Sequence, residues 1–240
     1  MHQVIGEPNS HAERMRQWGI DELVLLDISN SEKPFEHFRD DYKVKPVTNL
    51  SMFITRFGVE CSMPLSFGGN IKLFDDIQER IMCGADKVVL NSMFFENPNL
   101  ITKASKTYGK QAMVASIDYK KINDNKCSTF INKGKKNINL DPVVWAKEVE
   151  KIGAGEILLQ SIDRDGKANG YDLEIIQKVK DKVNIPVIAC SGAGHMRDIK
   201  ECFEKTSVEA VAAGNFFHFT ENAYPRTKKY LSIHRKDIRL

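Results

Sequence analysis

The sequence has no spacing that would indicate a metal site or a disulfide framework. Its five cysteines, at positions 61, 83, 127, 190 and 202, are scattered and form no Cys-x-x-Cys pair. This pattern favours reduced, mostly packed thiols over zinc ligands or disulfides. We therefore expect no metal and no other cofactor.

A strong charge of one sign and long apolar segments are also missing. The 240 residues carry 35 basic and 32 acidic side chains, a balance too even for a protein whose main task is to neutralise nucleic-acid phosphates. No apolar run is long enough to span a bilayer, and no charged segment followed by an apolar one opens the chain. We expect a cytoplasmic protein that binds neither nucleic acid nor membrane.

An internal repeat is the most informative feature that is present. Residues 63–92 and 185–215 each read as a strand, a glycine turn, a helix and a second strand that ends in a small or polar pair. At a constant offset of 122 residues, Asp76 corresponds to Asp198. A glycine turn after a parallel strand lets backbone N–H groups approach a phosphate. Two such turns predict a ligand with a phosphate at each end.

Seven short apolar runs bounded by turn signals are predicted to be strands. Segments with helical spacing lie between them, and such alternation indicates a parallel sheet. A chain of 240 residues fits one α/β barrel, so we expect a single domain over residues 1–240. The predicted strands are 22–28, 63–67, 87–91, 112–117, 156–161, 185–190 and 208–213, and the predicted helices are 9–18, 73–83, 97–108, 143–152, 173–182 and 196–205.

Pairing the two halves of the repeat leaves one strand without a counterpart. The run 22–28 resembles 156–161, whereas 112–117 has no twin, which would have to precede residue 1. A closed barrel of this kind needs eight strands. The predicted fold is therefore α/β, a (β/α)₈ TIM barrel of two half-barrels that lacks its first strand.

Two inserts and a basic tail interrupt this rhythm. Residues 29–46 lengthen the first loop after a strand, and residues 120–137 read as a small polar hairpin. The tail that begins at Lys228 is predicted to be a closing helix. Barrel ligands bind at the C-terminal ends of the strands, where such inserts lie.

Five segments resemble, in order and spacing, the cyclase subunit family of imidazole glycerol phosphate synthase, over about residues 6–219. The resemblance implies a barrel that binds the bisphosphorylated phosphoribulosyl-formimino intermediate of histidine synthesis. It also implies a heterodimer with a glutaminase that supplies ammonia from the opposite face. The products would be imidazole glycerol phosphate and aminoimidazole carboxamide ribotide. The segments are GIDELVLLDIS (19–29), GADKVVLNS (84–92), VASIDYK (114–120), GAGEILLQSIDRDGKANGYD (153–172) and ACSGAG (189–194).

The resemblance assigns roles to individual residues. Asp118 matches one of two catalytic aspartates, which take and return protons as the ring closes. Asp165 and Gly166 match a loop that contacts the substrate. Each glycine at these positions also fits a plain turn of positive φ. One phosphate site matches Gly69, Asn70, Asn91 and Ser92, and the other matches Ser191, Gly192, Gly214 and Asn215.

Three charged residues stand at or next to the starts of alternate predicted strands: Glu22, Lys87 and Glu156. Charges at the closed end of a barrel are costly unless they are paired. From the residues alone they would be surface ion pairs. The resemblance implies that they form a gate through which ammonia enters.

Several positions depart from the family pattern and leave two alternatives open. Gln160 stands where the synthase usually has threonine, and Asn70 and Ser191 replace glycines. The C-terminal half resembles a paralogous branch linked to surface polysaccharide, which passes ammonia to an amidotransferase that makes acetamidino sugars. A single-chain sugar isomerase also has two half-barrels and two phosphate sites, but the charged trio and the SIDRDG segment argue against it.

Overall fold

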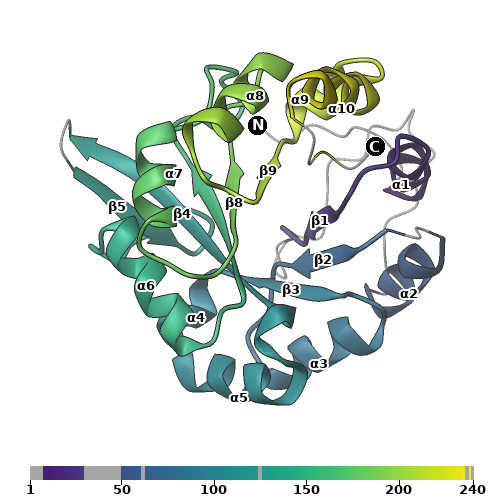
Figure 1. The fold of residues 1–240 in the computed structure, drawn as a ribbon. Coiled ribbons are helices and arrows are strands. Elements are labelled where there is room, and N and C mark those ends of the chain that lie inside the picture. Colours follow the sequence, from purple (N-terminus) through teal and green to yellow (C-terminus); the bar gives the residue numbers. More distant parts are fainter. Residues whose placement is uncertain (1–7, 30–49, 61–62, 124–125, 236–237, 239–240) are drawn as a thin grey trace. The chain divides into compact units, whose positions relative to one another are not determined.

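The computed structural model describes residues 8–29, 50–60, 63–123, 126–235 and 238. The chain divides into two compact units, Met1–Val89 and Leu90–Leu240 (Figure 1).

The first unit alternates helices with parallel strands. Strand β1 pairs with β2, and β2 pairs with β3, both in parallel register. Its elements are α1 (Pro8–Gln17), β1 (Leu23–Leu26), α2 (Leu50–Glu60), β2 (Leu65–Gly68), α3 (Phe74–Met82) and β3 (Lys87–Leu90), whose last residue begins the second unit.

The core of the first unit forms because alternate strand residues point to the same side. Leu65 and its register partner Leu23 belong to one apolar cluster with Met15 of α1. Ile54 and Phe57 of α2, one helical turn apart, are fully buried in the same cluster. This packing fixes α1 and α2 against the strands.

The second unit contains four parallel strands and a hairpin. The parallel pairs are β4 with β7, β7 with β8 and β8 with β9, while β5 pairs antiparallel with β4. The elements are α4 (Ser92–Glu96), α5 (Pro98–Tyr108), a 3₁₀ turn (Lys110–Ala112), β4 (Met113–Asn123), β5 (Lys126–Ile131), β6 (Lys136–Asn137), α6 (Pro142–Ile152), β7 (Glu156–Ser161), α7 (Leu173–Lys180), β8 (Val187–Cys190), α8 (Met196–Lys205), β9 (Ala210–Ala212), α9 (Asn215–Phe219) and α10 (Ala223–His234).

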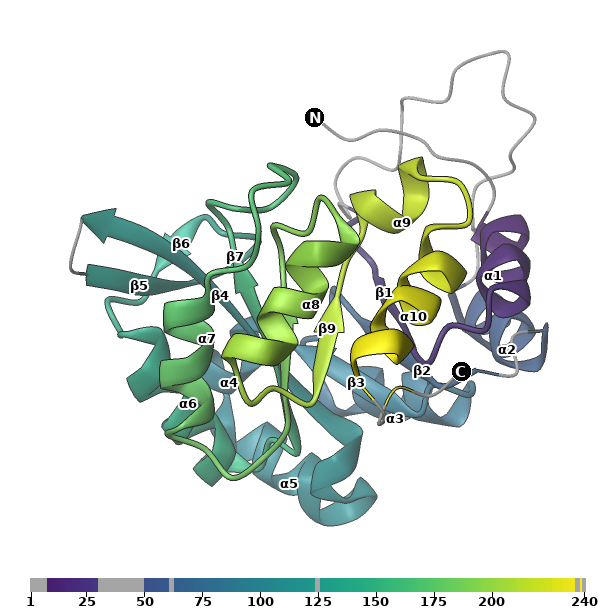
Figure 2. The ribbon, with the colours of Figure 1, turned by 45° about the horizontal axis from the view of Figure 1, so that its top comes forward.

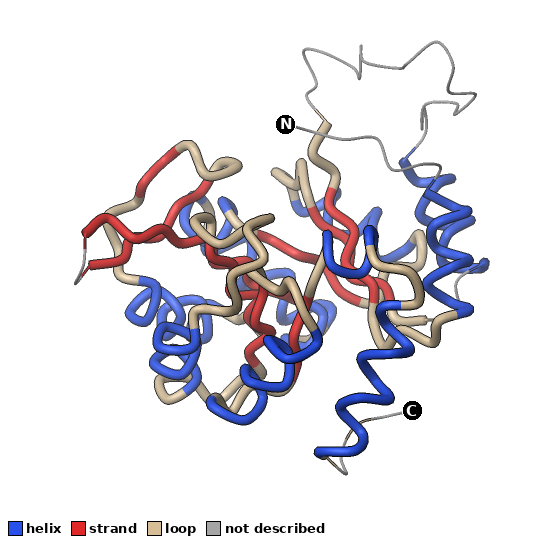
Figure 3. The backbone as a smooth tube through the Cα atoms, turned by 90° about the horizontal axis from the view of Figure 1, so that it is seen from above, coloured by secondary structure: helices blue, strands red, loops and turns tan. Residues whose placement is uncertain are grey.

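The hairpin of β4 and β5 extends beyond the parallel strands of its unit (Figure 2). Figure 3 shows the same two strands in red at the edge of the unit. Its register places Asp118 opposite Phe130 and Tyr119 opposite Thr129. The hairpin predicted at 120–137 is confirmed.

Helix starts in the second unit follow their local sequence. Asp141 accepts a hydrogen bond from the Val143 N–H (2.8 Å), and Pro142 stands at the first helical position of α6. Asn97 accepts from the Leu100 N–H (3.2 Å) at the start of α5. Such caps satisfy amides that a helix leaves without an internal partner.

The sequence repeat is also a repeat of contacts. The Leu65 N–H at the start of β2 donates to the Asp86 carboxylate (2.8 Å). In the second copy, the N–H of Val187, 122 residues after Leu65, donates to the carboxylate of Glu209, 123 residues after Asp86 (3.0 Å). In each copy, an acidic residue just before the next strand holds the start of the strand beside it.

All seven predicted strands and all six predicted helices are present, with ends shifted by a few residues. The closing helix is confirmed as α10. Three helices were not predicted: α2, α4 and α9. Apart from Ser29, the insert at 29–46 lies outside the described residues. The single domain and a strand before residue 1 stay predictions.

Parallel strands that alternate with helices confirm the α/β fold of TIM-barrel type. Over the part of the chain that the structure describes, no helix is both long and apolar enough to cross a membrane.

Candidate active site

A row of polar side chains crosses the C-terminal ends of the strands in the second unit. Asp118 of β4 is in register with Gln160 of β7, and Gln160 with Cys190 of β8. Register partners point to the same face of a sheet, whereas the preceding residues, such as fully buried Ile117 and Leu159, point to the other. The row therefore lies on the face away from this buried layer.

Asp118 has the properties of a proton-transfer group. Burial raises its pKa to about 6, the Ser116 hydroxyl opposes this rise, and the nearby charge of Asp165 adds to it. The Ser116 hydroxyl donates to the Asp118 carboxylate at 2.9 Å. A carboxyl with a pKa close to neutral can both accept and donate a proton. The side chain of Asp118 can therefore perform the chemistry predicted for it.

Cys190 contributes a neutral thiol to the same row. Burial, followed by the charge of Asp165, raises the pKa of Cys190 to about 11. At neutral pH the group is therefore a thiol and not a nucleophilic thiolate.

The second predicted phosphate turn has an unusual backbone. Ser191 (φ 80°) and Gly192 (φ 100°) both have positive φ. A Cβ atom at Gly192 would lie 2.1 Å from the carbonyl oxygen of Gly170. The hydroxyl of Ser191 is buried beside the Cys190 thiol, without the geometry of a hydrogen bond to any described residue. The glycine is needed for contact with a neighbouring loop, whatever ligand the turn binds.

The other members of this group lie close to the turn. Gly214 follows β9, and β9 is in register with β8. A Cβ atom at Gly166 would lie 3.5 Å from the side-chain nitrogen of Asn215. The structure thus brings the loop of Asp165 and Gly166 next to Asn215, another residue of the predicted site.

The amides just before α8 and α3 already have partners. Asp198 accepts from the N–H groups of Gly194 and His195, both at 2.9 Å. Asp76 accepts from the corresponding amides of Lys72 (2.7 Å) and Leu73 (2.8 Å). These four amides are therefore already bound within the chain, and a phosphate at either turn would have to use other N–H groups.

The first predicted turn shows the same backbone in the first unit. Gly69 (φ 89°) and Asn70 (φ 50°) both have positive φ. The Asn70 side chain donates to the Asp27 carboxylate (3.0 Å) and to the carbonyl of Ser29 (2.9 Å). The side chain of Asn70 therefore ties this turn to the end of β1.

Asp27 is a strand-end carboxylate that our site prediction left out. Burial alone would raise its pKa, but hydrogen bonds from Ser29 and Asn70 and the charge of Arg80 together lower it. The signal was present in the sequence, because Asp27 ends an apolar run as Asp118 does.

Asn91 and Ser92 are tied to the hairpin. The Asn91 side chain donates to the carbonyls of Ser116 (3.1 Å) and Phe130 (3.3 Å). The Ser92 hydroxyl accepts from the Asn132 N–H (3.0 Å). Because Gly69 and Asn70 belong to the other unit, the first phosphate site stays a prediction.

The charged trio is partly described. Lys87 donates to the Glu22 carboxylate (3.0 Å), whose other oxygen accepts from the Ser66 hydroxyl (2.5 Å). The side chains of Glu22 and Lys87 are 28% and 20% exposed. Glu22 and Lys87 thus form an ion pair in the first unit. Glu156 opens β7 in the second unit, in register with Val114 of β4, and its part in a gate stays a prediction.

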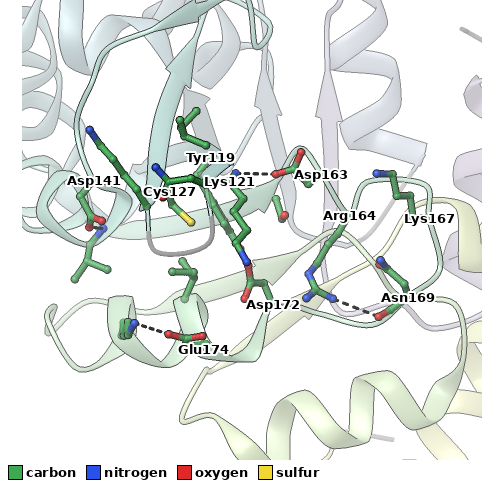
Figure 4. A pocket seen from close by; sticks show the side chains of 17 residues that line it. Tyr119, Lys121, Cys127, Asp141, Asp163, Arg164, Lys167, Asn169, Asp172 and Glu174 are labelled. Carbon is green, nitrogen blue, oxygen red and sulfur yellow. Dashed lines mark hydrogen bonds and ion pairs between the residues drawn. The ribbon is translucent and has the colours of Figure 1, made fainter.

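A polar cleft of about 710 Å³ was missed by the sequence analysis (Figure 4). It lies between the hairpin, the loop after β7 and the start of α7. Tyr119 has its pKa raised mainly by burial and then by Asp172. The Lys121 N–H donates to Asp163 (2.7 Å) across the cleft wall. The charged residues that line this cleft come from three segments of the chain and have no fixed spacing, so no sequence pattern indicates the cleft.

The chain is similar to known proteins over nearly its whole length. A family model described as "Histidine biosynthesis protein" matches residues 1–223. The imidazole glycerol phosphate synthase subunit HisF of Clostridium botulinum (strain Okra / Type B1) is 41% identical over 237 residues, which is 98% of this chain and 89% of that protein. The subunit HisF of Hydrogenobaculum sp. (strain Y04AAS1) is 38% identical, over 98% of this chain and 88% of that protein. The subunit HisF of Bacillus cereus (strain G9842) is 37% identical, over 99% of this chain and 90% of that protein.

Proposed function

Because the chain belongs to the family of histidine biosynthesis proteins, we propose that it acts as the cyclase-type subunit of imidazole glycerol phosphate synthase. It would use ammonia from a glutaminase partner to convert the phosphoribulosyl-formimino intermediate to imidazole glycerol phosphate and aminoimidazole carboxamide ribotide. The observation that carries this proposal is Asp118, a carboxyl with a pKa of about 6 near the C-terminal end of the segment over which β4 pairs in parallel with β7.

In this proposal, Asp118 moves protons as ammonia attacks and the ring closes. With a pKa of about 6, Asp118 is mostly ionised near neutral pH but lies close enough to its pKa to take a proton in one step and return it in another. Asp165 helps to keep the pKa of Asp118 high through its own negative charge. The buried hydroxyl of Ser191 and the amides of its turn would bind one phosphate of the substrate.

A test is to replace Asp118 by asparagine and supply ammonium directly. We expect the rate of product formation to fall by roughly a hundredfold or more, since general acid–base catalysis contributes about that much. The affinity for a phosphate ligand should stay within a few-fold, because only the transition state loses its proton acceptor. Asp75→Asn, at an exposed position on α3, is the control. Loss of ligand binding in Asp118→Asn would instead give the residue a structural role.

We further propose that the glutaminase docks at the N-terminal ends of the strands, around Glu22, Asp86, Lys87 and Glu156. The paired Glu22 and Lys87 support this, because an ion pair with partly exposed members can be rearranged by a partner. Lys87→Met should uncouple glutamine hydrolysis from the use of ammonia in the co-purified complex, while the fold stays intact. Unchanged coupling in that complex would remove the gate assignment.

A second candidate is the polysaccharide-linked paralogue, which passes ammonia to an amidotransferase. The observation that favours it is Gln160, which departs from the family pattern and stands in register with Asp118. The Asp118 experiment separates the two functions, because a protein that only conducts ammonia would form no imidazole product even before the substitution.

A further inference from the structure

The loop between β7 and α7 is fastened to the ends of both strands that follow it. This loop, residues 162–172, carries Asp165 and Gly166. Its Gly170 N–H donates to the carbonyl of Gly192 (2.8 Å). The hydroxyl of Tyr171 donates to the carbonyl of Ala212 at the end of β9 (3.0 Å). The loop therefore links the Ser191–Gly192 turn to the strand that precedes Gly214.

Arg164 holds this loop in shape from within. Its Nη1 donates to the carbonyls of Gly170 (3.0 Å) and Asn169 (3.3 Å). Gly170 is thus bound on both sides, through its oxygen by Arg164 and through its N–H by Gly192. The guanidinium is planar and stays charged, so it can hold two neighbouring carbonyls in a fixed arrangement.

The contact between the loop and the turn is close. A Cβ atom at Gly192 would lie 2.1 Å from the Gly170 oxygen and 3.4 Å from the Cβ of Arg164. A Cβ atom at Gly194 would lie 2.5 Å from the Cβ of Ala168. At such distances, any displacement of residues 168–170 must displace the turn as well.

Tyr171 is placed to fix the other end of the loop. Its side chain is 4% exposed, and burial raises the pKa of its hydroxyl well above the usual value. The hydroxyl therefore remains a hydrogen-bond donor at any pH at which the protein is studied. A buried donor of this kind is costly to leave without a partner, which favours the bond to Ala212.

We propose that Arg164 and Tyr171 are positioning residues for the second phosphate turn: they hold the Ser191–Gly192 turn at the spacing from Gly214 that a phosphate needs. The proposal rests on the proposed function for the presence of a phosphate at this turn. Neither residue has to touch the ligand. Figure 4 shows the Arg164 side chain in the polar cleft, hydrogen-bonded to Asn169.

The experiment is a titration of the ¹⁵N-labelled full chain with inorganic phosphate, read at the amides of Gly192, Gly214 and Gly69. The variants are Arg164→Gln, Arg164→Lys and Tyr171→Phe. The matched control is Lys167→Gln, which removes a positive charge from the same loop and the same cleft. The Gly69 amide reports the first turn in the same sample, so each variant also carries an internal control.

We expect Arg164→Gln to weaken phosphate binding read at Gly192 and Gly214 by about five- to tenfold, the equivalent of one or two hydrogen bonds. Tyr171→Phe should weaken it by about threefold on the same scale. Arg164→Lys should restore part of the affinity, because an ammonium can still donate to one carbonyl. Binding read at Gly69 should not change in any variant.

Four results would overturn the positioning role. Equal affinity at Gly192 in wild type and Arg164→Gln would show that the loop does not control the turn. An equal loss at Gly69 would show a general loosening of the fold. An equal loss in Lys167→Gln would show that the charge of Arg164 acts on the anion directly. A wild-type chain that binds no phosphate at Gly192 would remove the second phosphate site from the proposed function as well. Because no readout uses turnover, failure of the cyclase proposal alone leaves these results interpretable.

Discussion

The two glycine turns both contain two consecutive residues of positive φ but place their glycine differently. Both consist of two consecutive residues with positive φ, Gly69 and Asn70 in one copy and Ser191 and Gly192 in the other. In the first copy a Cβ on the glycine would lie 2.0 Å from the backbone carbonyl oxygen of Asp27. In the second it would lie 2.1 Å from the backbone carbonyl oxygen of Gly170. In each turn, glycine occupies the position that a neighbouring backbone approaches closely. The other position, Asn70 or Ser191, carries a side chain despite its positive φ.

The partners of the two turns differ in kind. Asn70 reaches with its own side chain to Asp27 and Ser29 at the end of β1. In the second turn, the Ser191 hydroxyl has no hydrogen-bond partner among the described residues, and the turn is bonded instead through its Gly192 carbonyl to the Gly170 N–H of the loop that carries Arg164 and Tyr171. The backbone of the repeat is thus kept while the means of fixing it has changed between the copies.

Adding a methyl group at either glycine tests the close approach and should have the largest effect. Gly69→Ala and Gly192→Ala should each lower the free energy of unfolding by about 3 kcal/mol or more, since backbone atoms must move and φ is unfavourable. Gly214→Ala, where a Cβ atom meets nothing within 4 Å, should cost less than about 1 kcal/mol. Urea unfolding of the three variants measures this. A small effect at Gly69 together with a large one at Gly192 would break the equivalence of the turns.

The two aspartates Asp118 and Asp27 should respond to pH in opposite directions. Asp118 has a folded-state pKa of about 6, above its usual 3.8, so its contribution to stability is complete below about pH 4 and is lost as pH rises through 6. Asp27 has a lowered pKa, so its contribution is present above about pH 4 and is lost as pH falls through the folded pKa.

Asp118→Asn should therefore be more stable than wild type at pH 8, by up to about 3 kcal/mol, and the gain should shrink toward zero near pH 4. Asp27→Asn should be less stable than wild type at pH 7, with a loss that shrinks below pH 4. Unfolding curves measured between pH 3 and pH 8 give both differences. A gain in Asp118→Asn that does not vary with pH would contradict the raised pKa.

Placing glycine at the other position of each turn should have the smallest effects, and they should have opposite signs. Ser191→Gly relieves positive φ in a residue that disfavours it and should stabilise by up to about 1 kcal/mol. Asn70→Gly gains less, because asparagine tolerates this conformation, and it loses the bonds to Asp27 and Ser29; it should destabilise by about 1 kcal/mol. Thermal unfolding distinguishes them, and equal signs would show that both turns are fixed in the same way.

Most of the elements could be predicted from the sequence because they depend on local patterns. The missed helix α2 runs over LSMFITRFGVE, where apolar residues are too frequent for a helical period to stand out. Its identity as a helix becomes clear only from the burial of Ile54 and Phe57 against the strands. The helices α4 and α9 have five residues each, which is too short for periodicity to indicate a helix.

The candidate site was predictable in its residues but less so in their partners. Asp118 and Gly192 were predicted from the resemblance to a family, and both follow a predicted strand, whereas Asp27 was left out although it also comes at the end of an apolar run. The hydrogen bonds from Asn91 to β4 and β5 could not be predicted, because its partners Ser116 and Phe130 are 25 and 39 residues away.

The sequence by itself determined the alternation of strands and helices, the repeat at an offset of 122 residues and the likeness to a family, since all three are properties of residue order. Only the tertiary structure decided which polar groups are already bound. Asp76 and Asp198 are equivalent in sequence. Only the folded chain shows that their carboxylates accept hydrogen bonds from the amides before α3 and α8. The pKa of Asp118 likewise depends on burial and on Asp165, 47 positions away in the sequence. The physical reason is that hydrogen bonds, burial and charge act through space, between residues that folding alone brings together.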